Sequence, residues 1–328
     1  ITFCFCDTLI LAQQNVIDSL QNALKTATED TSRVTILNHL CSKFISVNLE
    51  EASMYAEKAL QLAQKLRFDY GISEALYQKG YVNFYEGKND SAIFYYEQSK
   101  ILKEKINDKK GIARALNSIG SVHHERGNLS ESVNYYLQSL KINEEEKNQN
   151  GIASALLNIG VVFSDQKNFQ RSLEFTEKAC QAFSQAGDTA QIANAITRLG
   201  NVYWSLGETD KALKNYSRAL DMFERLNHKR GIGIVYNNMA GIYDEKGEAH
   251  PDPFQREALC NKALETYQKA LSIRESIGDK NGVVILLNNI GNVYSHLNKP
   301  AEAVSAYERS MKIAGEIGFK DLLRQNYK

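Results

Sequence analysis

The sequence predicts an all-α solenoid of seven antiparallel helix pairs. The chain matches itself when it is shifted by forty residues: GISEALYQKG at 71–80 aligns with GIARALNSIG at 111–120 and GIASALLNIG at 151–160. Each copy holds two segments in which apolar or small residues recur at helical spacing. Because a single helix pair cannot bury its apolar face alone, neighbouring pairs are expected to stack into one elongated domain.

The composition argues against several other classes of protein. Lysine plus arginine and aspartate plus glutamate are both 39, so the formal net charge is +0. A nucleic-acid-binding face is normally strongly basic, so we expect no nucleic-acid partner for this region. The five cysteines include no CxxC pair and no zinc-type cluster with histidine, so no metal is expected.

The first thirty residues are predicted to precede the repeats. Residues 1–12 form an apolar run that ends before Gln13 and Gln14, which is typical of the end of a secretory signal peptide. This predicts a periplasmic or extracytoplasmic location. The alternative is a cytoplasmic protein whose apolar run belongs to a first helix docked on the solenoid. Residues 13–30 are predicted to form an amphipathic helix that caps the first pair.

The predicted helix pairs follow the forty-residue register until an insertion of eleven residues. This insertion, at about 248–259, contains Pro251 and Pro253; it is interpreted as a lengthened turn in the sixth pair, with Pro253 starting the second helix early. It is expected either to contact a partner or to be tolerated because turns are exposed. Residues 322–328 are predicted to start a further, truncated repeat, and the parent protein to continue. The seven pairs are placed at 31–70, 71–110, 111–150, 151–190, 191–230, 231–281 and 282–321.

Glycines mark two places in each repeat. Gly87, Gly127, Gly207 and Gly247, with Lys167 and Asn298 as equivalents, are predicted to end first helices in the left-handed conformation. A second set lies inside the helices, where each glycine costs roughly 1 kcal/mol relative to alanine. These are expected to allow a close crossing by the small residue of the paired helix, such as Ser132 or Ala212. The set comprises Gly80, Gly120, Gly160, Gly200 and Gly291.

One repeat carries the clearest resemblance to a known family. Ile196, Leu199, Gly200 and Tyr203, followed by Ala212 and Tyr216, resemble the W-x2-L-G-x2-Y and A-x3-F pattern of the tetratricopeptide repeat. This chain departs from the pattern in its forty-residue length and in lacking the closing proline. It is similar to the extended variety found in kinesin light chains, polarity adaptors and bacterial signalling receptors. The resemblance covers about 31–321 and implies a right-handed superhelix that binds a protein or peptide.

Motifs of catalysis are missing from the sequence. It contains no GxxxxGK[ST], GxSxG, HExxH or EF-hand pattern, so we expect neither an enzyme nor a cofactor. His123 and His124 are adjacent on a helix and point in different directions, which disfavours a shared metal ion. His123 is predicted to be a core residue.

The resemblance also implies where a partner binds. In the family, first helices line the concave face, and positions spaced i, i+3, i+7 and i+10 share one stripe. Amide side chains recur there and can pair with a peptide backbone, while the single tryptophan could anchor a ligand. The alternative is that the asparagines bond between neighbouring helices and that the tryptophan is core. The predicted peptide-binding residues are Arg114, Asn117, Ser121, His124, Asn194, Asn201, Trp204, Asn237, Asp244, Asn288 and Asn292.

Three functions are compatible with these features. The leading prediction is a peptide-binding scaffold that forms the extracytoplasmic sensor or interaction region of a larger bacterial signalling protein. The alternatives are a cytoplasmic adaptor and a targeting arm of an enzyme whose catalytic domain lies beyond the C-terminus. Any membrane association is expected to come from flanking segments only.

Overall fold

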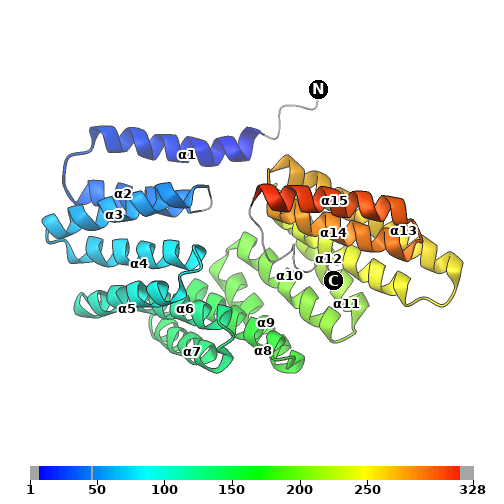
Figure 1. Cartoon of the computed structure of the whole chain (residues 1–328). Helices are drawn as coiled ribbons and strands as arrows, with labels where there is room; N and C mark the ends of the chain where they lie inside the picture. Colours follow the sequence, from blue (N-terminus) through cyan, green and yellow to red (C-terminus); the bar gives the residue numbers. More distant parts are fainter. Residues whose placement is uncertain (1–6, 46, 318–328) are drawn as a thin grey trace. The chain divides into compact units, whose positions relative to one another are not determined.

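The computed structural model describes residues 7–45 and 47–317, with side chains from residue 16 onward. All regular structure in this part of the chain is α-helical, which confirms the predicted fold class (Figure 1). Residues 1–6 of the predicted signal segment and the predicted truncated repeat at 322–328 lie outside the described residues. The helices are α1 (Asp7–Thr26), α2 (Thr31–Phe44), α3 (Leu49–Lys65), α4 (Asp69–Tyr85), α5 (Asn89–Lys105), α6 (Lys109–Glu125), α7 (Leu129–Glu145), α8 (Gln149–Asp165), α9 (Phe169–Ala186), α10 (Thr189–Ser205), α11 (Thr209–Arg225), α12 (Lys229–Glu248), α13 (Pro253–Ser276), α14 (Lys280–His296) and α15 (Pro300–Glu316).

Two compact units divide the chain between α9 and α10, where the repeats predicted a single domain. The first unit runs from Ile1 to Gly187 and the second from Asp188 to Lys328. The contacts are dense within helix pairs and between successive pairs of one unit, as expected for stacked repeats.

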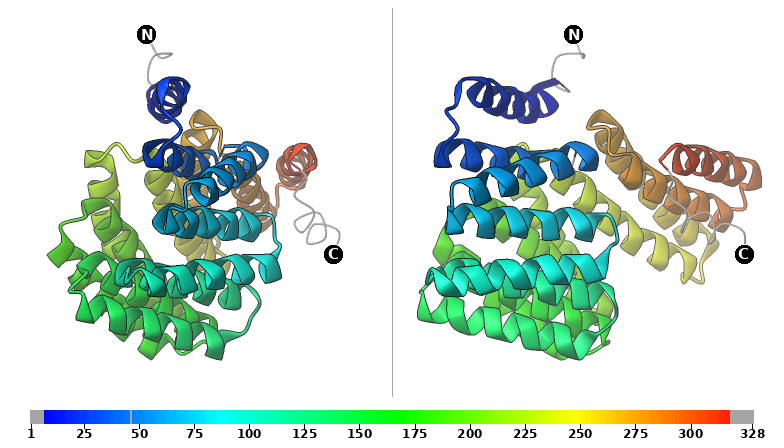
Figure 2. Two further views of the ribbon diagram at one scale, coloured as in Figure 1. Left: turned by 90° about the vertical axis from the view of Figure 1, so that its left-hand side faces the viewer. Right: turned by 60° about the vertical axis from the view of Figure 1, so that its left-hand side comes forward.

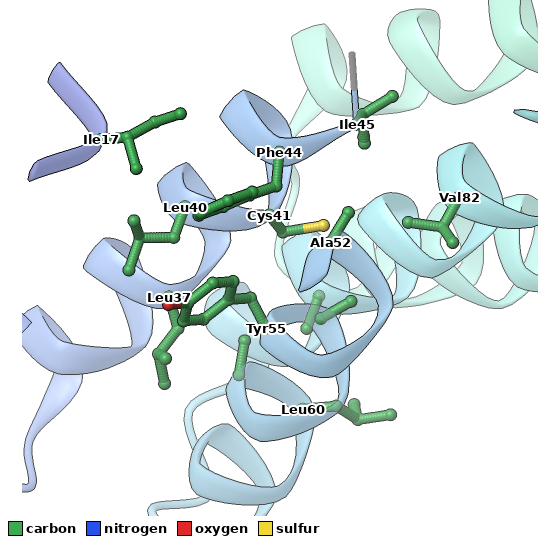
Figure 3. Packing of buried hydrophobic residues seen from close by; sticks show 13 residues of the cluster. Ile17, Leu37, Leu40, Cys41, Phe44, Ile45, Ala52, Tyr55, Leu60 and Val82 are labelled. Atoms are coloured by element: carbon green, nitrogen blue, oxygen red, sulfur yellow. The ribbon is translucent and has the colours of Figure 1, made fainter. Parts of the chain in front are cut away.

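The helix α1 covers the start of the first unit. It begins at Asp7, earlier than the capping helix expected from residue 13, and lies alongside α2 (Figure 2). Its Ile17 is 2% exposed and packs in a cluster with Leu37, Leu40 and Phe44 of α2 (Figure 3). Burial of a side chain of this size contributes about 1.5–3 kcal/mol, so α1 stabilises the first pair.

The first helices end as predicted in most repeats. Gly87, Gly127 and Gly207 have φ values of 73°, 76° and 77°, and Lys167 and Asn298 adopt the same left-handed conformation at 58° and 56°. The prediction is wrong for Gly247, because α12 continues through it to Glu248. A Cβ at Gly247 would lie 2.7 Å from the Cys260 sulfur, so this glycine permits close packing of α12 against α13.

The insertion lengthens helices rather than the turn. The helices α12 and α13 have 20 and 24 residues, whereas most others have 17. Pro253 begins α13 as predicted, and Asp252 caps it by accepting a hydrogen bond from the Phe254 amide at 3.1 Å. The early start of the second helix at Pro253 is thus confirmed, but most of the added residues extend α12 and α13, and only residues 249–252 lie between the two helices.

The glycines inside the helices mark close crossings, as predicted, and at most of them the nearest contact is a tyrosine ring of the paired helix. A Cβ at Gly200 would lie 2.5 Å from Tyr216 Cε1, and one at Gly291 would lie 2.5 Å from Tyr307 Cε1. The same relation holds between Gly80 and Tyr96 and between Gly120 and Tyr136, whereas Gly160 faces Thr176. At four of these glycines the tyrosine ring sixteen residues later occupies the space where a side chain would lie. The predicted small residue also comes close at two of them, because a Cβ at Gly120 would lie 3.3 Å from the Ser132 carbonyl oxygen and one at Gly160 would lie 3.4 Å from that of Ser172. No helix within the described residues has the length and apolar character needed to cross a bilayer.

Candidate peptide-binding surface

One face of α6 carries the predicted binding residues of the first unit. Arg114, Asn117, Ser121 and His124 follow each other at helical spacing, and the last three are half-buried while Arg114 is exposed. The neighbouring first helices α4 and α8 lie on either side of α6. The three helices therefore present one shared surface in this unit.

Arg114 is fixed by contacts to α4. Its Nη2 donates to both carboxylate oxygens of Glu74, and its guanidinium lies 4.2 Å from the centre of the Tyr77 ring. Burial alone would raise the pKa of Glu74, but the charges of Arg114 and Lys103 hold that pKa below its ordinary value. Glu74 is thus a half-buried carboxylate whose charged form is favoured by the two neighbouring cations.

The rest of the α6 face is tied to α8 and α7. The Asn158 amide donates to Asn117 Oδ1 at 3.1 Å, and His124 Nε2 lies 2.5 Å from Asp165 Oδ2. Ser121 Oγ is 3.1 Å from the Tyr136 hydroxyl of α7. These contacts orient the polar side chains and leave part of each one's hydrogen-bonding capacity unused.

In the second unit, the predicted asparagines are joined in the same way. Asn201 Oδ1 accepts from the Tyr216 hydroxyl at 2.7 Å and from the Asn238 amide at 2.9 Å. The Asn289 amide donates to Asn237 Oδ1 at 3.0 Å. Asn292 accepts a hydrogen bond from the Tyr307 hydroxyl, and the Asn194 amide donates one to Gln191 of the same helix. Asn288 also has an interaction partner.

Trp204 and Asp244 lie near the C-terminal ends of α10 and α12. The Trp204 indole N–H donates to Glu245, and its ring packs on Gly241, where a Cβ would be 2.7 Å from it. Asp244 Oδ1 lies 2.9 Å from His296 Nδ1. Burial raises the pKa of Asp244 despite this contact, because desolvation disfavours the charged form. Trp204 is half-buried, so it is neither a core residue nor a free anchor.

These contacts form a regular ladder between successive first helices. The partners are 41 residues apart at Asn117–Asn158, His124–Asp165 and Trp204–Glu245. Across the insertion the spacing becomes 52, at Asn237–Asn289 and Asp244–His296. The alternative interpretation, that asparagines bond between helices, therefore describes much of this face. The predicted residues also fall into two sets, one in each unit.

Two hollows in the first unit were not predicted. One, of about 520 Å³, is lined by Tyr70, Glu74, Asp108, Arg114 and Asn117 among others, and a second, of about 350 Å³, adjoins it. A sequence signal was present: Lys103 occupies a core position of the register, where an apolar residue such as Phe183 or Phe223 stands in later repeats. Lys103 is 0% exposed, so its charge must be matched nearby.

His123, predicted to be core, is half-buried. Its ring stacks on Tyr135 with the centroids 5.2 Å apart. Within the described residues, no three histidine, cysteine or acidic side chains are grouped as a metal site would require.

Comparison with known proteins places this architecture in a family. A tetratricopeptide repeat model matches residues 111–185, 188–250 and 255–316, and a second tetratricopeptide model matches 73–104. No curated protein matches the sequence.

Solved structures with similar folds have low sequence identity. The apo form of RapI is 14% identical with a TM-score of 0.63, over 87% of this chain and 98% of its own. A Rap protein complexed with competence and sporulation factor is 16% identical with a TM-score of 0.56, over 95% of this chain and 94% of its own. A signal transduction ATPase with a tetratricopeptide repeat sensor from Pyrococcus horikoshii is 18% identical with a TM-score of 0.59, over 78% of this chain and 39% of its own. Since the family models cover more than half of the sequence, the chain belongs to the tetratricopeptide repeat family.

Proposed function

We propose that the chain is a peptide-binding scaffold whose ligand lies along the first helices of a unit. The observation that carries this proposal is the ladder of polar side chains on these helices. Cross-helix bonds such as Asn158–Asn117 and Asn238–Asn201 hold the amides in fixed orientations. An amide has two donors and two acceptor lone pairs, so each can serve a neighbour and still bind a peptide backbone.

Pre-ordering of these side chains favours binding. A side chain that is already immobilised loses little further conformational entropy when a ligand arrives. Trp204 adds an aromatic surface that is held by Glu245 and remains partly exposed. The likeness to a Rap protein complexed with competence and sporulation factor supports a binding role but extends only to the fold.

We further propose that the scaffold is the extracytoplasmic sensor or interaction region of a larger bacterial signalling protein. The apolar composition of residues 1–12 supports this location. N-terminal sequencing of protein exported by the native host should begin near Gln13. Recovery of stable cytoplasmic protein with residues 1–12 intact would favour the adaptor instead.

Peptide binding is tested by selecting binders from a random peptide display library on the immobilised chain. The selected peptides should bind wild-type protein, and Trp204→Ala or Asn237→Ala should weaken those that dock on the second unit. Phe254→Ala is the control, because Phe254 is 84% exposed at the start of α13 and lies off the first-helix face. Failure to select any binder would contradict the proposed function.

A further inference from the structure

One contact recurs near the C-terminal ends of successive first helices. In it, a side chain of one first helix bonds to the side chain one register place further along the next first helix. We call these contacts the end rungs. They join His124 to Asp165, Trp204 to Glu245, and Asp244 to His296. Two of the three rungs pair a histidine with an aspartate, and the two residue types exchange places between the units.

The histidine rung of the first unit joins α6 to α8. His124 Nε2 lies 2.5 Å from Asp165 Oδ2, and the exposed fractions of the two side chains are 27% and 53%. Arg126, which follows α6, is already paired with Asp90 of α5. The other titratable side chains around the end of α6 are Glu125 on the same helix, Tyr85 at the end of α4 and Tyr135 on α7.

The histidine rung of the second unit joins α12 to α14 and is better shielded from water. His296 Nδ1 lies 2.9 Å from Asp244 Oδ1, and its Nε2 lies 3.9 Å from Glu248. The exposed fractions of His296 and Asp244 are 26% and 16%. Burial raises the pKa of Cys260 and of Tyr267 on α13, so both side chains stay uncharged at neutral pH. The other charged side chains near this end of the unit are Glu245, Arg256 on α13, and Lys299 and Glu302 at the start of α15.

Protonation of the histidines strengthens these two rungs. A histidine takes up its proton between about pH 8 and pH 5. Once charged, His124 or His296 forms an ion pair with its aspartate, in place of a hydrogen bond in which only the carboxylate is charged. Each histidine also lies in the last turn of its helix, where a positive charge interacts favourably with the helix dipole.

The direction of the pH effect follows from the unfolded state. In the unfolded chain neither the aspartate nor the helix end is near the histidine, so the added charge stabilises only the folded arrangement. This contribution is therefore present at about pH 5.5 and is lost as the pH rises to about 8. Because Asp165 is more exposed than Asp244, solvent screens the first rung more, and the effect is expected to be larger in the second unit.

The other cross-helix contacts lack this property. The Trp204 indole that bonds to Glu245 carries no proton that is gained or lost in this range. The amide pair Asn117–Asn158 lies two turns before the rung on α6 and does not titrate either. The pH-sensitive contacts between first helices are thus the two histidine rungs.

We propose that the two histidine–aspartate rungs form an acid-responsive clamp, which holds α6 to α8 and α12 to α14 more tightly at about pH 5.5 than at about pH 8. The inference does not depend on the proposed peptide binding. The clamped helices carry the polar ladder, so acid makes this face of each unit more rigid.

Hydrogen–deuterium exchange of the full chain at pH 5.5 and pH 8 tests the clamp. The measured quantity is the protection factor, corrected for the intrinsic exchange rate, of segments that cover the C-terminal halves of α8 and α14. In His124→Gln and His296→Asn, an uncharged amide N–H replaces the ring nitrogen that faces the aspartate. The ratio of the protection factor at pH 5.5 to that at pH 8 should be about threefold or more higher in wild type than in the variant of the same unit. Equal ratios would overturn the proposal.

Two further variants separate the clamp from a structural role. His39→Gln replaces an exposed histidine on α2 and should keep the wild-type ratio. Asp165→Asn retains an oxygen acceptor but removes the charge, so its ratio should fall as in His124→Gln, and it carries the test if that variant does not fold. A loss of protection that is the same at both pH values would show that the rung is only structural and would overturn the clamp.

Discussion

Gly200 provides a sharp test of how the helix pairs pack. In Gly200→Ala the new Cβ would lie 2.5 Å from Tyr216 Cε1 and 2.7 Å from Cδ1, whereas carbon atoms in contact are normally about 3.5–4.0 Å apart. The ring must therefore move by roughly 1 Å. Tyr216 is 0% exposed and its hydroxyl donates to Asn201, so a shift of the ring would displace neighbouring core atoms and strain this hydrogen bond.

The magnitude follows from three opposing contributions. Overpacking of a filled core costs about 1–3 kcal/mol, and the hydrogen bond is worth about 1 kcal/mol. Alanine gains about 1 kcal/mol over glycine in helix propensity. We therefore expect a net loss of about 1–3 kcal/mol in the free energy of unfolding of the second unit.

The assay is urea unfolding followed by the fluorescence of Trp204, which lies one turn beyond Gly200 on α10. Gly315→Ala is the control, because Gly315 lies in α15 and nothing stands within 4 Å of its Cβ position. That control should be unchanged or slightly more stable. If Gly200→Ala unfolds at the same urea concentration as wild type, the packing argument is refuted.

Two further predictions concern the first unit. The pKa of Glu74 is lowered in the folded state, so its stabilising contribution is present above the unfolded-state pKa of 4.5 and is lost as the pH falls through the folded-state pKa. In Glu74→Gln, the free energy of unfolding should therefore fall less steeply with decreasing pH below 4.5 than in the wild type. An unchanged slope would count against the ion cluster with Lys103 and Arg114. Asn158→Ala removes the bond to Asn117 and should lower the free energy of unfolding by about 1 kcal/mol in chemical denaturation, whereas no loss would mean that this part of the ladder does not couple α6 to α8.

The fold was predictable because the same sequence pattern recurs in several copies of the repeat. Copies such as 111–120 and 151–160 fix the helix register, and the left-handed ends at Gly87 and Gly127 follow from glycine. The prediction that Gly247 ends a helix was wrong because a glycine can either end a helix or allow another helix to approach closely. Only the position of Cys260 distinguishes these two uses.

The site was predictable in part. Helical spacing identified Arg114 and Asn117 as neighbours on one face, which the structure bears out. It could not identify their partners, because Glu74 and Asn158 come from other repeats and depend on how the helices stack. For the same reason Asn201 could not be known to accept from Tyr216; its removal is expected to lower stability as well as binding.

Hydrogen–deuterium exchange of the chain with and without a selected peptide tests the central claim most directly. If the ligand lies along the first helices, exchange should slow in α4, α6 and α8, or in α10, α12 and α14, relative to the second helices of the same unit. Slowing confined to second helices such as α5, α7 and α11, or to the turn at 249–252, would contradict the account.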